Sequence, residues 1–394
     1  MMQPLQTAAK YRIQSIDLLK GLVMVIMAID HVRDYFHYSS YFFDPTDPTL
    51  TTVPIFFTRF ITNFCAPAFS FLAGLSAFMV GQRKTQNELS IFLLKRGLWL
   101  VFVELVIMNF GWCFDVSFRT VGFQVIWILG ISMIFLAGLI RLPKNAILIF
   151  SCVLIFGHNL LDNIHFDNSI LWAFLHERKA FLTTPDHVFR VGYSIIPWVA
   201  VMSLGYCFGS FYDKTFDPLK RRKYFNIIGV SAIILFVILR SINIYGNLLP
   251  WVDYGNLKQN IFSFLNLTKY PPSLTFLLVT LGGAFLFLAN SEKIKGKIVN
   301  FFCVFGRVPF FFYIIHIYLI HFLALLTAEF TGLGWQKMIL PALPFRVEAL
   351  KGFGFNLIGV YLVWLFVIGL LYPLCKKFDK YKQAHKEKWW LSYL

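Results

Sequence analysis

Stretches of about 20 mostly apolar residues recur along the whole chain of 394 residues, and they restrict its fold more than any single motif does. A helix needs about 20 such residues to cross the hydrocarbon core of a bilayer. Only 14% of the residues are charged, whereas soluble domains carry about 25%. The sequence therefore predicts an all-α, polytopic integral membrane protein and excludes a soluble globule, a disordered chain and a disulfide scaffold. We expect about ten transmembrane helices, at 15–36, 55–80, 91–112, 122–140, 145–161, 190–211, 223–245, 272–290, 301–325 and 355–375.

The net charge of +16 is explained by topology, so nucleic acid is not needed as a partner. Of the 36 Lys and Arg residues, 22 fall in the termini and loops on one side of these spans and 11 fall on the other. Cytoplasmic loops carry the excess of Lys and Arg, so both termini are expected in the cytoplasm. We expect a cytoplasmic N-terminus (1–14), a single transmembrane domain (15–375) and a basic aromatic cytoplasmic tail (376–394) that lies on anionic lipid through Trp389, Trp390 and Tyr393.

The first span carries a polar stripe. Asp17, Lys20, His31 and Asp34 fall on one helical face at 100° per residue. Lys20 and His31 are separated by about 16 Å along the helix axis, which is over half of the hydrocarbon thickness. Charged groups at membrane depth are unfavourable and usually functional. The stripe therefore predicts a polar pathway across the membrane. In the structural alternative, Asp17 pairs with Lys20, while His31 and its charged neighbours simply sit at the interface.

Roles along this stripe follow from side-chain chemistry. His31 has a pKa near neutrality and suits a general base at the outer end of the pathway. Asp30 or Asp34 could orient its ring and stabilise the protonated form. At the cytoplasmic end, Lys20, with Asp17 one turn before it, could meet a phosphate or carboxylate that arrives from the cytoplasm. Arg33 lies with His31 near the outer end of the span.

Polar residues in three other spans extend the prediction. Arg59 and Asn63 open the second span, and Lys269 enters the eighth from outside. Arg307 lies about one turn inside the ninth span, where a cation can receive an anionic cofactor. His316 and His321 follow on the same helix, and hydrogen-bonded core histidines are the alternative for both. Arg307 lies toward the cytoplasm, His316 lies near the middle of its span, and His321 and Lys269 lie nearer the outer side.

The outer segment 158–190 holds four histidines and four acidic residues, but their spacing fits no metal signature that we can name. We expect a solvated loop there and no metal. The six cysteines lack a CxxC pair and lie in or beside apolar runs, so buried thiols are expected. A phosphate-binding loop, a dinucleotide fingerprint and a nucleophile elbow are absent from the sequence.

Combined motifs resemble the bacterial members of the heparan-α-glucosaminide N-acetyltransferase-like family. The resemblance runs from about residue 12 to residue 375. It implies a transmembrane acyltransferase that uses acetyl-CoA as donor on the cytoplasmic side and acetylates an amine of a sugar on the far side. The motifs are SIDLLKGLVM (15–24), MAIDHVRD (27–34), TNFCAP (62–67) with FLAG (71–74), IPW (196–198) with GY (205–206), KYPPSL (269–274) and FGRVP (305–309) with FY (312–313) and HIYLIH (316–321).

The resemblance also bears on single residues. The wider superfamily of O-acetylating membrane proteins has a basic residue eleven positions before a histidine on its first helix, which is the spacing of Lys20 and His31. By position, His37 matches the family's catalytic histidine as well as His31 does. Two residues depart from the family pattern. Lys20 stands where arginine is usual and loses bidentate phosphate contact, and Asn63 stands where histidine is usual and removes a base.

From the residues and the resemblance together, we expect an integral membrane acyltransferase of the bacterial cytoplasmic membrane. The acetyl group would move from cytoplasmic acetyl-CoA to an amine or hydroxyl, such as that of a glycan, on the outer side. His31 is the expected base, with His37 in reserve, and Asn63 is expected to donate a hydrogen bond to the developing oxyanion. The residues expected on the donor side are Asp17, Lys20, Arg307 and His316, and those expected on the acceptor side are Arg33, Arg59, Lys269 and His321. Lipid and a small acceptor are the expected partners, and a homodimer stays open. A transporter that uses the polar stripe and a non-catalytic membrane scaffold are the alternatives.

Overall fold

A computed structural model describes residues 13–392. Lys10, Arg12 and Tyr393, with most of the expected N-terminal segment 1–14, lie outside the described residues. The α-helices are α1 (Gln14–Phe36), α2 (Val53–Thr62), α3 (Cys65–Gly81), α4 (Gln86–Phe102), α5 (Asn109–Cys113), α6 (Val125–Leu139), α7 (Lys144–Gly157), α8 (Ile170–Leu175), α9 (Ile195–Phe208), α10 (Pro218–Ile242), α11 (Leu257–Leu265), α12 (Leu274–Ser291), α13 (Lys297–Arg307), α14 (Pro309–Phe330) and α15 (Leu357–Ala384).

Seven helical stretches in the described part of the chain are long and apolar enough to cross a membrane. The expected count of ten is therefore not confirmed. Of the other three expected spans, 15–36 is a long helix with five charged residues, 91–112 is α4 followed by a π-helical turn (η1, Val103–Met108) and α5, and 122–140 holds the 15-residue α6. The seven stretches are Val53–Gly81, Lys144–Leu161, Ile195–Tyr212, Pro218–Ile242, Leu274–Ser291, Pro309–Phe330 and Leu357–Ala384.

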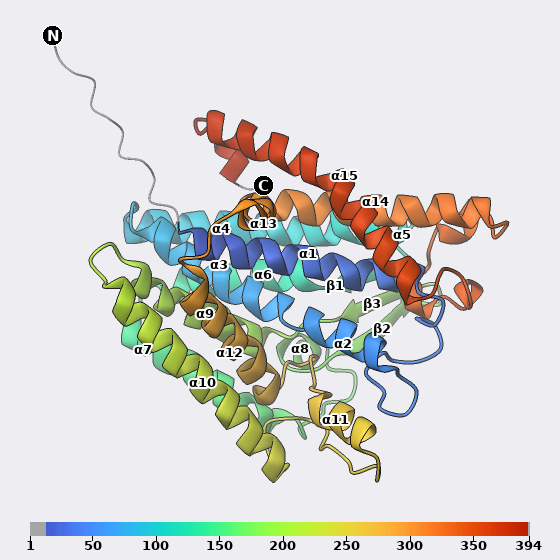
Figure 1. Ribbon diagram of the computed structural model, residues 1–394, viewed down its shortest axis with the longest axis horizontal. Coiled ribbons are helices and arrows are strands. Elements are labelled where there is room, and N and C mark those ends of the chain that lie inside the picture. The colour runs from blue at the N-terminus through green and yellow to red at the C-terminus, as the bar shows by residue number, and fades with distance from the viewer. Residues whose placement is uncertain (1–12, 393–394) are drawn as a thin grey trace.

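Helix α1 runs through the centre of the bundle, with α13, α14, α15 and α3 around it (Figure 1). Its contact with α13 brings two backbones together at Gly21 and Gly306. A Cβ atom on Gly306 would lie 1.8 Å from the carbonyl oxygen of Asp17, and one on Gly21 would lie 1.8 Å from that of Phe302. Small residues permit such close helix pairs in membranes. The polar helix is thereby held inside protein rather than against lipid.

Two expected spans are each divided into two helices. The span 55–80 breaks at Asn63 and Phe64 between α2 and α3, and the span 301–325 breaks at Val308 between α13 and α14. Pro309 occupies the first turn of α14, where its missing N–H leaves no hydrogen bond unmade. In contrast, α15 continues through Pro373 to Ala384, so the last span and the start of the basic tail form one helix.

A small three-stranded sheet adds to the expected all-α fold. It contains β1 (Thr120–Phe123), β2 (Lys179–Thr184) and β3 (His187–Val191) in the order β1-β3-β2, with β3 parallel to β1 and antiparallel to β2. The expectation of a plain solvated loop at 158–190 is therefore wrong. Aromatic packing supports the pairing of β1 with β3, because the rings of Phe189 and Phe123 lie with their centroids 4.4 Å apart. The expected span at 190 also begins later, at Ile195, because Arg190 lies in β3.

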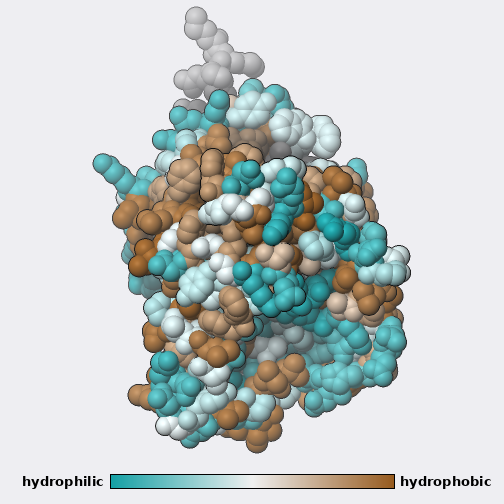
Figure 2. Space-filling view, turned by 90° about the vertical axis from the view of Figure 1, so that its right-hand side faces the viewer, coloured by the Kyte–Doolittle hydropathy of each residue, from teal (hydrophilic) through white to brown (hydrophobic). Residues whose placement is uncertain are grey.

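The sheet lies at the end of the bundle where α1 finishes (Figure 1). Figure 2 views the molecule from this side, and hydrophilic residues gather across the middle of the face. Segments far apart in sequence close this end: Phe355 N–H donates to the carbonyl of Phe36, and Leu340 N–H donates to that of Cys113. The C-terminus of α1 is therefore covered by the chain that follows α14.

Candidate active site

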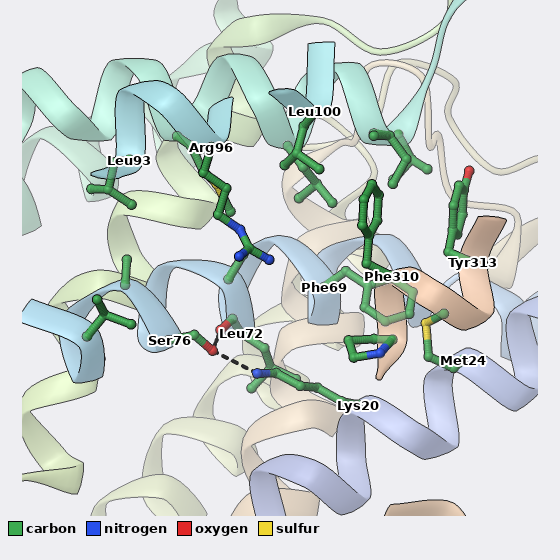
Figure 3. A pocket seen from close by; sticks show the side chains of 18 of the residues that line it. Lys20, Met24, Phe69, Leu72, Ser76, Leu93, Arg96, Leu100, Phe310 and Tyr313 are labelled. Carbon is green, nitrogen blue, oxygen red and sulfur yellow. Dashed lines mark hydrogen bonds between the residues drawn. The ribbon is translucent and has the colours of Figure 1, made fainter. Parts of the chain in front are cut away.

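A cavity of about 230 Å³ opens between α1, α3, α4, α6 and α14 (Figure 3). Most of its wall is aliphatic or aromatic, and only a few polar groups reach it. A pocket of this kind is the usual form of a small-molecule site. Its lining residues are Lys20, Met24, Phe69, Leu72, Ala73, Ser76, Ala77, Val80, Phe92, Leu93, Arg96, Leu100, Val125, Ile126, Leu129, Met133, Pro309, Phe310 and Tyr313.

Two cations enter this cavity from opposite walls. Lys20 Nζ on α1 donates a hydrogen bond of 2.7 Å to Ser76 Oγ on α3. Arg96 on α4 extends across the cavity toward this pair (Figure 3). Among residues 13–392, none of those that line the cavity is acidic. In apolar surroundings two positive groups attract an anion more strongly than they would in water. This end of the cavity is therefore suited to phosphate.

His31 lies two helical turns beyond Met24 on the same helix. Its ring meets the indole of Trp112 edge-on at 4.9 Å between centroids and lies 5.2 Å from the ring of His316. Both ring nitrogens of His31 are buried, with no hydrogen-bond partner among residues 13–392. Buried polar atoms without partners are uncommon in folded proteins. The ring can therefore accept a proton from a bound molecule without first losing a protein partner.

His316 presents a second such nitrogen. Its Nδ1 lies 3.0 Å from the carbonyl oxygen of Phe312, which fixes the proton on Nδ1 in the neutral ring. The other nitrogen, Nε2, is buried and has no partner within the described chain. Tyr313, one turn earlier on α14, lines the cavity. Helices α1 and α14 thus run together from the cavity to the histidine pair.

The aspartates beside His31 bond arginines instead of the histidine. Arg33 lies 2.8 Å from Asp30 Oδ1 and 3.1 Å from Asp34 Oδ1, and Arg59 of α2 also pairs with Asp30. The expected carboxylate bond to His31 is therefore not formed. A guanidinium offers several donors in a fixed plane and competes well for a carboxylate. The result is a charged network that joins α1 to α2 next to His31.

A further group of cations surrounds Tyr270, just before α12. The Arg178 guanidinium lies 4.5 Å from the centroid of its ring, and Lys269 Nζ lies 5.5 Å away. Burial acts to raise the pKa of the Tyr270 phenol, but Lys269, Arg59 and Arg178 outweigh it and lower that pKa to about 8. Lys269 is also close enough to His31 to act on it electrostatically. The predicted acceptor residues Arg59 and Lys269 are thus brought toward one place.

Other predicted residues have different surroundings. His37 directly follows α1 and is buried, and its Nδ1 shares a 2.7 Å hydrogen bond with the hydroxyl of Ser39. Burial and the nearby Arg33 lower the pKa of His37 to about 4. His321 is fully buried, with its ring nitrogens 2.9 and 2.8 Å from the carbonyl oxygens of Gly111 and Met338. The structure therefore gives His321 a role in joining α14 to its neighbours.

Three predicted residues remain. Arg307 does not line the cavity, and its Nε donates a 2.7 Å hydrogen bond to Asp379 on α15. Asp17 is buried where α13 packs on α1, and its backbone carbonyl lies against Gly306 of α13. Asn63 is buried at the break between α2 and α3. Asp17 therefore lies in a helix contact, Arg307 joins the end of α13 to α15, and Asn63 lies at the break between α2 and α3.

Sequence reasoning gave no role to three polar residues at or near the site, although Glu104 was recognisable as a charge inside a predicted span. Arg96 was counted with the loop charges, although it lies five residues inside a predicted span, and that position was the available signal. Glu104 is fully buried and accepts 2.9 and 3.0 Å hydrogen bonds from the amides of Ile126 and Trp127 at the start of α6. Carboxylates stabilise helix N-termini in this way. The indole Nε1 of Trp112, beside His31, is buried without a partner in the described residues, and no sequence signal marks it.

Comparison with known proteins identifies one family. The sequence model described as heparan-alpha-glucosaminide N-acetyltransferase, catalytic, matches residues 12–245, which is more than half of the chain. No curated protein matches. The matched region contains α1 to α4, and with them Lys20, His31 and Arg96. The predicted family is thereby confirmed, and the match supports an enzyme of the acetyltransferase class.

Proposed function

The chain belongs to the heparan-alpha-glucosaminide N-acetyltransferase catalytic family, and from this premise we propose that it moves an acetyl group from acetyl-CoA to an acceptor across the membrane. The donor enters from the side of Lys20 and Arg96. The acceptor, an amine or hydroxyl such as that of an amino sugar, arrives from the side of the sheet. His31 lies between them as the general base. The observation that carries this proposal is the pair of unpartnered, buried ring nitrogens of His31 in the described chain, two helical turns from a cavity that two cations enter.

The cavity fits the reactive arm of the donor better than the whole molecule. Its volume of about 230 Å³ is below the roughly 300–1,000 Å³ of pockets that enclose complete drug-sized ligands. The acyl-pantetheine arm is narrow and largely apolar, as the cavity walls are. Lys20 and Arg96 meet the diphosphate at the mouth, and the nucleotide stays outside. Arg96 thus replaces Arg307 as the second phosphate ligand of our proposal.

The chemical step uses the free ring nitrogen of His31. It accepts the proton of the acceptor's amine or hydroxyl as that atom attacks the thioester carbonyl carbon. The tetrahedral intermediate then expels the coenzyme A thiolate, which takes the proton back from His31. The products are the acetylated acceptor and free coenzyme A, so the protein returns to its starting protonation state. General base catalysis of this kind contributes about 10²–10⁴-fold in rate.

The oxyanion that develops on the thioester carbonyl needs a hydrogen-bond donor. The Trp112 indole N–H lies beside His31 and has no partner in the described residues, and Asn63 lies at the α2–α3 break. A donor already aligned in a water-poor site stabilises such an oxyanion by about 3–4 kcal/mol. We propose Trp112 as the first candidate and Asn63 as the second. Cations around Tyr270 face the acceptor and favour one that carries negative charge.

The test is transfer of labelled acetyl from acetyl-CoA to glucosamine by protein purified in nanodiscs. Coenzyme A release is followed in parallel, so that hydrolysis is separated from transfer. Calorimetry of acetyl-CoA binding to the wild type and to the Lys20→Ala and Arg96→Ala variants locates the donor site. The proposal predicts binding that both variants weaken. No binding of acetyl-CoA or of longer acyl-CoAs would overturn it, and proton-coupled flux in vesicles would then favour the transporter.

A further inference from the structure

Three potential metal ligands meet at the C-terminal end of α7, away from the proposed acyl-transfer site. His158 begins the 3-10 turn η2 (His158–Leu161), Asp162 follows that turn directly, and His176 follows α8. One ligand atom of each residue lies within 4.8 Å of the other two. The rings of the two histidines are 5.6 Å apart between centroids. None of these three residues lines the donor cavity.

Burial makes this cluster different from a solvated loop. His158 and His176 are each only 2% exposed. Both ring nitrogens of His158 and Nδ1 of His176 have no hydrogen-bond partner among residues 13–392. A buried polar group without a partner is unfavourable, and native structures contain few of them. These unpartnered nitrogens therefore indicate that something else bonds to the cluster.

We propose that His158, Asp162 and His176 bind a divalent transition-metal ion, with Zn²⁺ as the first candidate. Imidazole nitrogens and a carboxylate oxygen are its usual ligands, and three protein ligands leave a fourth position for water. Ligand atoms of a tetrahedral zinc site lie about 3.3 Å apart, given metal–ligand bonds of about 2.0–2.1 Å. His176 Nε2 and Asp162 Oδ1 are already 3.0 Å apart, and the ligand atom of His158 lies within 4.8 Å of both ligand partners.

The neighbours of the cluster hold its carboxylate in place. Asn159 Nδ2 donates a 2.7 Å hydrogen bond to Asp162 Oδ2 and leaves Oδ1 directed at His176. Asn159 Oδ1 also accepts a 2.8 Å bond from the amide of Leu274, the first residue of α12. Hydrogen bonds of this kind orient metal ligands. The ion would therefore connect α7 and α8 to the start of α12, which follows Tyr270 closely in the sequence.

The experiment uses the full chain with an affinity tag that contains no histidine. The protein is stripped with a chelator, incubated with ZnCl₂ and desalted, and its zinc is counted by mass spectrometry. We expect about one ion per wild-type chain. The Asp162→Asn variant keeps the shape of the side chain but removes its charge, and it should lose at least about tenfold in affinity, as should His176→Ala. The matched control is His165→Ala, because His165 belongs to the same segment but is largely exposed, and this variant should bind zinc normally.

Cobalt provides a second readout that needs no variant. Wild-type protein loaded with Co²⁺ should show the intense visible absorption bands of a four-coordinate cobalt ion. Addition of Zn²⁺ should displace the cobalt and remove these bands. A wild type that retains no zinc after loading would overturn the proposal. So would Asp162→Asn and His176→Ala variants that bind zinc as tightly as the wild type does. If His176→Ala elutes as an aggregate, Asp162→Asn and the cobalt spectrum decide the question.

Discussion

The imidazole rings of His31 and His316 face each other across the contact between α1 and α14, with their centroids 5.2 Å apart. Nε2 of His316 and both nitrogens of His31 are buried without partners in the described chain. A molecule that reaches this contact can therefore form a hydrogen bond with either ring without first breaking one within the described protein.

Replacing His31 with alanine should lower kcat about 10²–10⁴-fold, because the proton of the acceptor then lacks its base. Acetyl-CoA affinity should change little, since His31 does not line the donor cavity. Steady-state kinetics and calorimetry measure the two effects separately. His37→Ala in parallel separates the two candidate histidines. Loss of activity in His37→Ala with retention in His31→Ala would reverse our assignment.

Replacing Arg96 with alanine should raise the KM for acetyl-CoA by roughly 10–100-fold, since a hydrogen bond to a charged group contributes about 1.5–3 kcal/mol. Lys20→Ala should act in the same direction. Lys95→Ala is the matched control, because Lys95 is adjacent in sequence but exposed. Equal KM values for Arg96→Ala and Lys95→Ala would remove Arg96 from the donor site.

Asp30→Asn should reduce the free energy of unfolding by up to about 3–5 kcal/mol, because the buried Arg33 and the partly buried Arg59 then lose their shared carboxylate. Thermal unfolding in detergent measures this loss. The control is Glu348→Gln, which breaks an exposed ion pair with Lys351 and should leave the melting temperature nearly unchanged. A similar small change in both variants would show that the network near His31 does not stabilise the fold.

Gly306→Ala should destabilise the protein by at least about 1–3 kcal/mol, because its new Cβ would meet the Asp17 carbonyl of α1 at 1.8 Å. Gly369 in α15 is the matched control, because a methyl group at that position would have no neighbouring atom within 4 Å. Gly369→Ala should therefore stabilise its helix by about 0.5–1 kcal/mol. Melting temperatures that move in the same direction for both variants would contradict the close packing of α1 and α13.

Stability should fall as the pH is lowered from about 6.5 to about 4, in part through His37. The pKa of His37 is lowered from 6.5 to about 4 in the folded protein, so the unfolded chain binds more protons in this window. The contribution is fully present above pH 6.5 and amounts to about 3 kcal/mol at most. Comparison of melting temperatures for the wild type and His37→Gln across this range measures it. An unchanged pH slope in His37→Gln would contradict the role of His37.

Hydropathy and helical periodicity were enough to predict the helical membrane fold, because burial in lipid acts on every residue of a span. The family was also recognisable from its short motifs, and the match over residues 12–245 confirms it. The polar stripe that contains Lys20 and His31 could be predicted from the geometry of a single helix. The number of ten spans, the placement of the termini and the catalytic roles remain predictions.

Contacts between helices could not be read from the sequence, because they depend on which faces pack together. Tertiary structure turned Arg96 toward Lys20, set His316 against His31 and paired Asp30 with Arg59. It also folded part of the segment 158–190 into a hairpin and brought His176 to His158 and Asp162. Most of these relationships join residues far apart in the chain. Local spacing determined the polar helix at the centre of the protein, and packing around that helix decided which side chains its polar groups meet.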